Sequence, residues 1–175
     1  MRWRRIESLT LVGLLLAGGA MAADEANKPA DEPPELKALD RFRGTWKGTL
    51  RTPEGEEIAG ESTSRWVLGG KFLQTDWTLQ DTKGMILRGY DQEAKKYRMY
   101  WFTSDDTEAG SQQTGTWDEA TKTFTTTGTL ANGRGSVTTT AKFPNDDTEE
   151  WEINLKLPDV PTPIKITGTN KRQKK

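Results

Sequence analysis

The chain has 175 residues, of which 33% are hydrophobic, and it contains seven tryptophans but neither histidine nor cysteine. Without imidazole or thiol groups it cannot form disulfides, Cys/His zinc sites, thiolate nucleophiles or histidine-ligated haem. Its 25 Lys and Arg against 26 Asp and Glu give a net charge of -1, which indicates no basic face, so we expect no nucleic-acid partner.

The first 22 residues are typical of a secretory signal peptide. Three arginines precede an apolar run from Leu9 to Gly19, and Ala20-Met21-Ala22 has small residues at the two positions that signal peptidase reads. The alternative, an uncleaved membrane anchor, is disfavoured because a membrane-spanning helix needs about 20 apolar residues. We therefore expect export to the periplasm or the extracellular space, no stable membrane insertion, and a mature protein that begins near residue 23.

The rest of the chain divides into three parts. Residues 23–35 are acidic and rich in proline, and we interpret them as a disordered tether because they contain too little apolar surface to order themselves. Residues 36–172 have the length of a single domain. Residues 173–175 form a short basic tail, for which a solvated terminus is a better interpretation than a binding patch.

The domain begins with a short helix. One or two turns are predicted after Pro34, because the apolar side chains of the segment recur at helical spacing. This apolar stripe, which we expect to close one end of the domain, consists of Leu36, Leu39 and Phe42.

Ten strands rich in Thr, Val, Ile and aromatic residues follow the helix. They are predicted over Gly44–Thr52, Gly60–Leu68, Lys71–Leu79, Met85–Tyr90, Lys96–Thr103, Gly110–Trp117, Thr123–Leu130, Gly135–Lys142, Glu149–Leu157 and Ile164–Thr169. Short connections force antiparallel neighbours in up-and-down order. Because an open sheet of ten strands would leave two bare edges, the sequence predicts an all-β fold, a single closed antiparallel β-barrel.

Alternation along the strands identifies the inner face. Trp46 and Leu50 share one side of the first strand, and Trp151 and Ile153 share one side of the ninth, so these side chains are predicted to point inward. The strand from Tyr97 to Phe102 is apolar on both sides. We expect the N-terminal helix to cover its outer side, and a dimer contact is the alternative that stays open.

The segment Leu39-Asp-Arg-Phe-Arg-Gly-Thr-Trp46 resembles the opening of lipocalins and related calycin barrels. In those barrels the tryptophan closes one end beneath a basic side chain from the end of the last strand. The resemblance therefore implies a barrel plug formed by Gly44 and Trp46 with Arg172, or with Lys171 as the alternative.

Three further segments are similar to the exported bacterial domain-of-unknown-function 1579 family. They are Trp66–Leu73, Gly89-Tyr90-Asp91 with Lys95-Lys96-Tyr97, and Trp101–Asp105 with Gly115-Thr116-Trp117-Asp118. The resemblance covers about Leu36 to Asp118 and implies a lipocalin-like barrel without an established activity. Related nitrobindin-type barrels bind haem through histidine, and this chain has none, so that function does not carry over.

A small-molecule binder is the leading functional hypothesis, because a closed barrel of this size can enclose an apolar or amphipathic ligand. The residues predicted to contact the ligand are Trp66, Gln74, Trp77, Arg88, Tyr97, Met99 and Trp101. The sequence does not decide whether Arg88 and Gln74 point inward. An unpaired interior guanidinium at Arg88 would favour an anionic head group.

Two other functional classes stay open. One is a structural or protein-interaction module of the cell envelope with a filled interior. The other is an enzyme that relies on Asp, Glu, Tyr, Lys or Ser, but no activated arrangement is visible, so we expect no catalytic residues and no cofactor. Whatever the function, we expect Trp46 and Trp151 to be core residues. We also expect no metal site, and interpret the acidic stretch from Asn145 to Glu150 as solvated loop charge.

Overall fold

The computed structural model describes residues 33–105, 110–130 and 133–174. The predicted signal peptide, and the predicted tether up to residue 32, lie outside the described residues. The elements are α2 (Pro34–Asp40), β1 (Gly44–Arg51), β2 (Glu57–Val67), β3 (Phe72–Leu79), β4 (Thr82–Asp91), β5 (Lys96–Thr103), β6 (Ser111–Asp118), β7 (Thr123–Thr129), β8 (Ser136–Asn145), β9 (Thr148–Lys156) and β10 (Ile164–Arg172).

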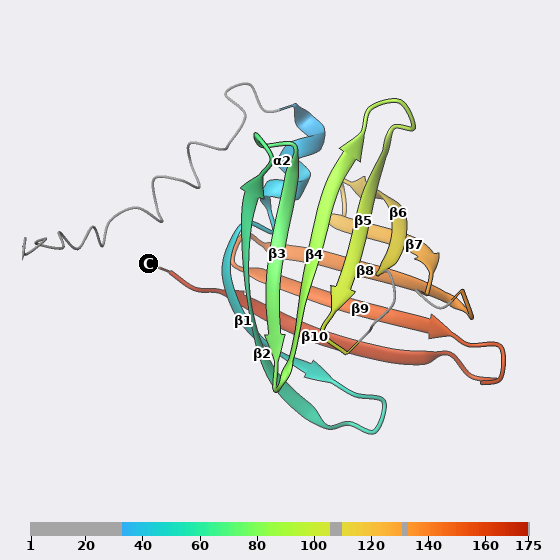
Figure 1. The fold of residues 1–175 in the computed structure, drawn as a ribbon. Helices are drawn as coiled ribbons and strands as arrows, with labels where there is room; N and C mark the ends of the chain where they lie inside the picture. Colours follow the sequence, from blue (N-terminus) through green and yellow to red (C-terminus); the bar gives the residue numbers. More distant parts are fainter. Residues whose placement is uncertain (1–32, 106–109, 131–132, 175) are drawn as a thin grey trace, which may run out of the picture.

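The strands form a closed barrel in which each strand pairs with its neighbours in sequence and β1 pairs with β10 (Figure 1). Every pairing is antiparallel, and closure aligns Trp46 with Arg172 and Thr49 with Thr169. This confirms the predicted barrel and its short preceding helix. Four strands extend three residues beyond the predicted bounds: β2 and β4 begin earlier, at Glu57 and Thr82, and β8 and β10 end later, at Asn145 and Arg172. The extension of β8 includes a register irregularity.

One end of the barrel is filled by aromatic rings. Phe42 lies in edge-to-face contact with Phe124, at 5.5 Å between ring centroids, and with Phe143, at 4.9 Å. Helix α2 lies across this end, and its Ala38 and Leu39 are buried in the same cluster (Figure 1). The helix therefore closes the end, as expected, and its burial explains how so short an element is held.

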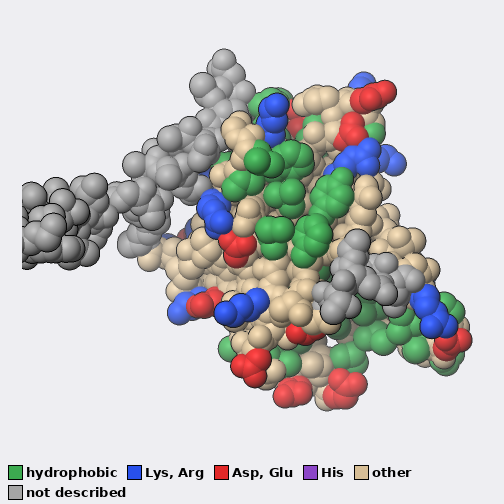
Figure 2. All heavy atoms as spheres, in the orientation of Figure 1, with side chains coloured by type: hydrophobic (Ala, Val, Ile, Leu, Met, Phe, Trp, Pro, Cys, Tyr) green, Lys and Arg blue, Asp and Glu red, His purple; other side chains and the backbone are tan. Residues whose placement is uncertain are grey.

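The expectation that this helix also covers the outer side of β5 is wrong. The described helix meets β5 through the inward-facing Tyr97, whose hydroxyl donates to the carbonyl of Glu35. On the outer side Phe102 stays 38% exposed. Figure 2 shows hydrophobic side chains gathered on the face over β3, β4 and β5. The seven-residue helix is too short to span both the barrel end and this face.

Candidate functional site

The three residues of the expected plug come together at the closed end. Trp46 is only 2% exposed, and the Arg172 guanidinium lies 4.2 Å from its ring centroid. Arg172 also donates from Nη2 to the carbonyl of Arg41 at 3.0 Å and from Nη1 to the carbonyl of Arg43. Gly44 has φ +105°, and an added Cβ would lie 3.1 Å from Arg172 Nη1. Positive φ and this close approach explain the glycine.

Inside the barrel, next to the plug, lies a cavity of about 290 Å³ that is partly open to solvent. Its apolar wall is formed mainly by Trp46, Leu50, Trp77, Leu79, Ile86, Met99, Trp101, Phe124, Trp151, Ile153 and Ile166. Its interior polar side chains include Ser62, Ser64, Thr75, Arg88, Thr139, Glu149 and Asn170. The structure thus places four of the predicted ligand residues on the cavity: Trp77, Arg88, Met99 and Trp101.

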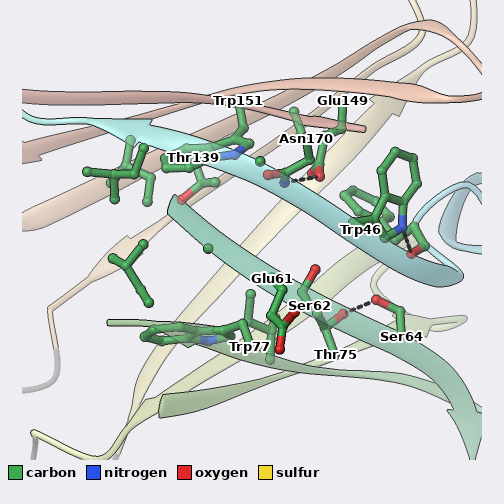
Figure 3. Close-up of a pocket in the computed structure, with 18 of the residues that line it drawn as sticks. Trp46, Glu61, Ser62, Ser64, Thr75, Trp77, Thr139, Glu149, Trp151 and Asn170 are labelled. Atoms are coloured by element: carbon green, nitrogen blue, oxygen red, sulfur yellow. Dashed lines mark hydrogen bonds between the residues drawn. The ribbon is translucent and has the colours of Figure 1, made fainter. Parts of the chain in front are cut away.

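Two tryptophans lie against opposite walls of the cavity, each over a glycine of the neighbouring strand (Figure 3). A Cβ added to Gly84 would lie 2.2 Å from the Trp77 ring, and one added to Gly168 would lie 2.2 Å from the Trp151 ring. Trp77 also contacts Trp101, with 5.5 Å between ring centroids. The glycines give the indoles room to lie against the walls and leave space between them. Trp151, expected in the core, therefore lines the cavity.

Arg88 points inward and is 7% exposed, which answers the question that the sequence left open. It lies in phase with the inward Ile86 of β4. Its Nη1 donates to Thr75 Oγ1 at 2.8 Å, that hydroxyl lies 2.7 Å from Ser64 Oγ, and the guanidinium lies 4.2 Å from the Phe42 ring centroid. Burial lowers the pKa of Arg88 to about 10, so the side chain stays charged at neutral pH.

Glu149 and Asn170 form a second polar group, across the cavity from Ser64 and Thr75 (Figure 3). Asn170 Nδ2 donates to Glu149 Oε2 at 2.8 Å. Burial raises the pKa of Glu149, and the opposing influences are the Asn170 hydrogen bond and the positive charges of Arg88 and Arg172. The interior therefore carries one cationic and one acidic side chain on different walls.

The interpretation of Asn145 to Glu150 as solvated loop charge is wrong at Glu149. Strand β9 begins at Thr148, so Glu149 lies within a strand and in phase with Trp151 and Ile153. The signal was present in the sequence: the alternation that turns Trp151 inward also turns Glu149 inward. The predicted strand Glu149–Leu157 already contained Glu149, but the alternation was applied only from Trp151 onward.

Three buried polar atoms have no hydrogen-bond partner among the described residues: Arg88 Nε, Trp77 Nε1 and Thr139 Oγ1. All three residues line the cavity. Buried polar atoms are almost always paired, and leaving one unpaired costs about 1–3 kcal/mol.

Three predicted ligand residues lie elsewhere. Trp66 is buried at the closed end, where its Nε1 donates to Asp40 Oδ1 at 2.8 Å, and Tyr97 bonds to Glu35 at 3.0 Å. Both rings therefore anchor α2 and do not line the cavity. Gln74 lies on the outer side of β3, bonded to a neighbouring aspartate. For these three the predicted contact with an interior ligand is not supported by their positions.

Within the described residues, no group of three or more acidic side chains is placed to hold a metal ion. A search of the same residues for a helix long and apolar enough to cross a membrane finds none.

A sequence model of the family described as "Protein of unknown function (DUF1579)" matches residues 32–163. The chain belongs to this family. The resemblance found in the sequence reached only to about Asp118. The family match continues beyond it and includes strands β7, β8 and β9. No curated protein sequence matches the chain.

Several solved structures resemble this DUF1579 barrel, among them the following two. The crystal structure of Rv2717c from M. tuberculosis has a TM-score of 0.63 and 14% identity, and the match covers 82% of this chain and 100% of that one. The S-type phycobiliprotein lyase CPES from Guillardia theta has a TM-score of 0.54 and 13% identity, over 82% of this chain and 99% of that one. At these identities the likeness shows a shared fold and no more.

Proposed function

We propose that this DUF1579 protein is an exported binder of a small apolar or amphipathic molecule, which it holds inside the barrel without transforming it. The observation that carries the proposal is the cavity of about 290 Å³ inside the barrel. It is lined by aromatic rings and by three residues with a buried polar atom that has no partner in the described part of the chain. Ligand pockets are concave and mostly apolar, with a few placed polar groups. The interior of this barrel has that composition.

The cavity volume limits the size of the ligand. Taking ~30 Å³ for each heavy atom, as in liquid water, the cavity holds roughly ten non-hydrogen atoms. An eight-carbon chain buried there would gain roughly 6 kcal/mol at about 0.8 kcal/mol per methylene, before the costs of association. A longer chain would have to extend out of the cavity.

The interior hydroxyl groups support binding without catalysis. A hydroxyl nucleophile needs an adjacent general base. Ser64 and Thr75 are hydrogen-bonded to each other, and Thr75 accepts from Arg88. A guanidinium that stays protonated at neutral pH cannot take up the hydroxyl proton, so this network suits ligand orientation better than nucleophilic attack.

The alternative function is a structural module of the cell envelope with a filled barrel. The closed end fits that description, because its aromatic cluster is densely packed. The cavity between Trp77 and Trp151 does not, since a purely structural barrel would gain stability by filling it. The hollow interior therefore favours the binder.

Native mass spectrometry of protein purified from its host would test the proposal directly, because a retained ligand adds a defined mass. Tryptophan fluorescence titrated with octan-1-ol and naphthalene would complement it. We expect a shift in wild type that is reduced in Trp101→Ala, which changes the cavity wall, and preserved in Trp117→Phe, whose ring lies outside the cavity. No retained mass together with no response to either probe would favour the structural module.

Export is tested separately by N-terminal sequencing of the protein from its host. The Ala20-Met21-Ala22 segment leads us to expect a mature chain that begins near residue 23. Finding an intact Met1 in membrane-bound material would contradict export through a cleaved signal peptide.

A further inference from the structure

The charges inside the cavity specify the head group of its ligand. We infer that the ligand is uncharged overall and has a dipolar head group, with a hydrogen-bond acceptor toward Arg88 and a donor toward Glu149. The inference rests on the proposed function, because it concerns the occupant of the same cavity. It differs from the expectation of an anionic head group, which took account of the guanidinium alone.

The wall around Arg88 offers hydrogens that lack an acceptor. Arg88 uses Nη1 to donate to Thr75, while its buried Nε has no partner among the described residues. The contact between Ser64 and Thr75 uses one of their two hydroxyl hydrogens, whichever residue donates. The other hydroxyl hydrogen and the Arg88 Nε hydrogen therefore have no acceptor among the described residues. A ligand group that meets this wall should present an acceptor.

The opposite wall, around Glu149, offers hydrogen-bond acceptors instead of donors. A carboxylate has about four acceptor sites on its two oxygens. Within the described residues Glu149 accepts a hydrogen bond from Asn170 alone, at Oε2. Glu149 Oε1 is thus free to accept from a ligand. A group that meets this wall should present a donor.

Charge balance argues against a ligand with a net charge. No ion pair within 4 Å joins Arg88 to a carboxylate in the described part of the chain, but each of Arg88 and Glu149 influences the other electrostatically across the cavity. With Glu149 ionised, the two charges cancel and the interior is neutral. An anion would leave one uncompensated negative charge in a desolvated site, and a cation would leave one positive charge. A neutral dipole adds no net charge and aligns with the field between the two walls.

The other charged groups near the cavity have partners at the surface. Arg172 lies behind Trp46, bonded to backbone carbonyls and 3.6 Å from Asp147. Glu61 borders the cavity but is exposed and faces Lys47 at 3.9 Å. Water screens Glu61 far more than the two interior groups, and Arg172 is compensated by Asp147. Arg88 and Glu149 therefore set the charge that a ligand meets.

The inference is tested with three probes that share an eight-carbon chain: octanamide, octanoate and octylammonium. Affinities are measured calorimetrically at about pH 8, where the carboxylate and the amine are both ionised. Wild type should bind octanamide at least tenfold more tightly than either ion. Glu149→Gln, which leaves Arg88 uncompensated, should shift the preference toward octanoate by tenfold or more. Arg88→Gln should shift it toward octylammonium.

Matched controls remove a charge of the same sign from the outer side of the same strands. Glu150→Gln alters the exposed neighbour of Glu149, and Lys83→Gln alters an exposed residue of β4. Both should keep the wild-type order. The double variant Arg88→Gln/Glu149→Gln should restore the preference for octanamide, because its interior is again neutral.

The outcomes separate the two proposals. Tight binding of octanoate by wild type, with no change of order in Glu149→Gln, would overturn the dipolar head group and leave the binding function intact. Failure of all three probes with every folded variant would refute the binding function, and the inference with it. If Arg88→Gln does not fold, the comparison of wild type, Glu149→Gln and Glu150→Gln still decides the matter.

Discussion

Truncating Trp46 to alanine should destabilise the barrel by about 3–5 kcal/mol, the usual cost for a buried aromatic ring. The ring is 2% exposed, and its Nε1 donates to the Phe42 carbonyl at 2.8 Å. It also lies beneath the Arg172 guanidinium, at 4.2 Å. Alanine would leave a void, an unpaired carbonyl and a cation without its aromatic face. Because single domains have a net stability of about 5–15 kcal/mol, this one change removes a third or more of it in most cases.

Two milder variants divide that loss into its parts. Trp46→Phe keeps most of the ring but removes the indole donor, so it should cost about 1–3 kcal/mol through the unpaired Phe42 carbonyl. Arg172→Met keeps the side-chain stem and removes the guanidinium from the ring and from the carbonyls it binds. The double variant Trp46→Ala/Arg172→Met should cost less than the sum of the single variants, because the two residues share one contact.

Urea denaturation followed by far-UV circular dichroism measures these differences, and a thermal scan should show Trp46→Ala melting roughly 10–20 °C below wild type. Trp117→Phe, on a half-buried ring outside the cavity, serves as the control. A melting temperature unchanged by Trp46→Ala would refute the role of this tryptophan as the plug. Strict additivity of the double variant would refute its coupling to Arg172.

Three further predictions concern the cavity. Gly168→Ala should weaken binding of octan-1-ol, because the new Cβ would lie 2.2 Å from the Trp151 ring and force it into the cavity, and calorimetry would measure the loss. Thr139→Val should stabilise the empty protein by about 1 kcal/mol in urea denaturation, because it removes a buried hydroxyl that has no partner. Glu149 has a raised pKa, so its contribution to stability is present below the ordinary glutamate pKa and is lost as pH rises through the raised value. As the pH rises from acid to neutral, Glu149→Gln should therefore become more stable relative to wild type. The melting temperatures of both proteins would be measured at several pH values, and a constant difference between them would contradict this.

The closed barrel could be predicted because each element carried its own signal. Turn residues separate ten short strands, and the period-2 pattern around Trp46 marks the inner face without knowledge of the neighbouring strands. The pairing of Trp46 with Arg172 came from a family resemblance. Spacing could not have supplied it, because the two residues lie at opposite ends of the barrel sequence and meet only when β1 pairs with β10.

The cavity was harder to predict because depth along the barrel axis depends on the stagger of the strands. Trp66 and Trp77 both point inward from adjacent strands, yet Trp66 packs under the helix and Trp77 lines the cavity. Alternation along a strand predicts whether a side chain points inward, but not how far along the barrel axis it lies. Trp151 lines the cavity for the further reason that Gly168 is its partner across the strands, a pairing that no local pattern shows.

The closed end of the barrel and the cavity differ in how well their polar atoms are paired. At the closed end Trp46 has its donor satisfied and its ring covered, as expected for a core built to stay folded. Along the cavity, Trp77 and Arg88 each keep a buried donor that no other described residue pairs, although unpaired donors destabilise the protein. Apolar replacements would remove that cost, and its persistence beside the cavity supports the proposal that the barrel holds an occupant. The arrangement that weakens the empty barrel would then be the one that holds the ligand.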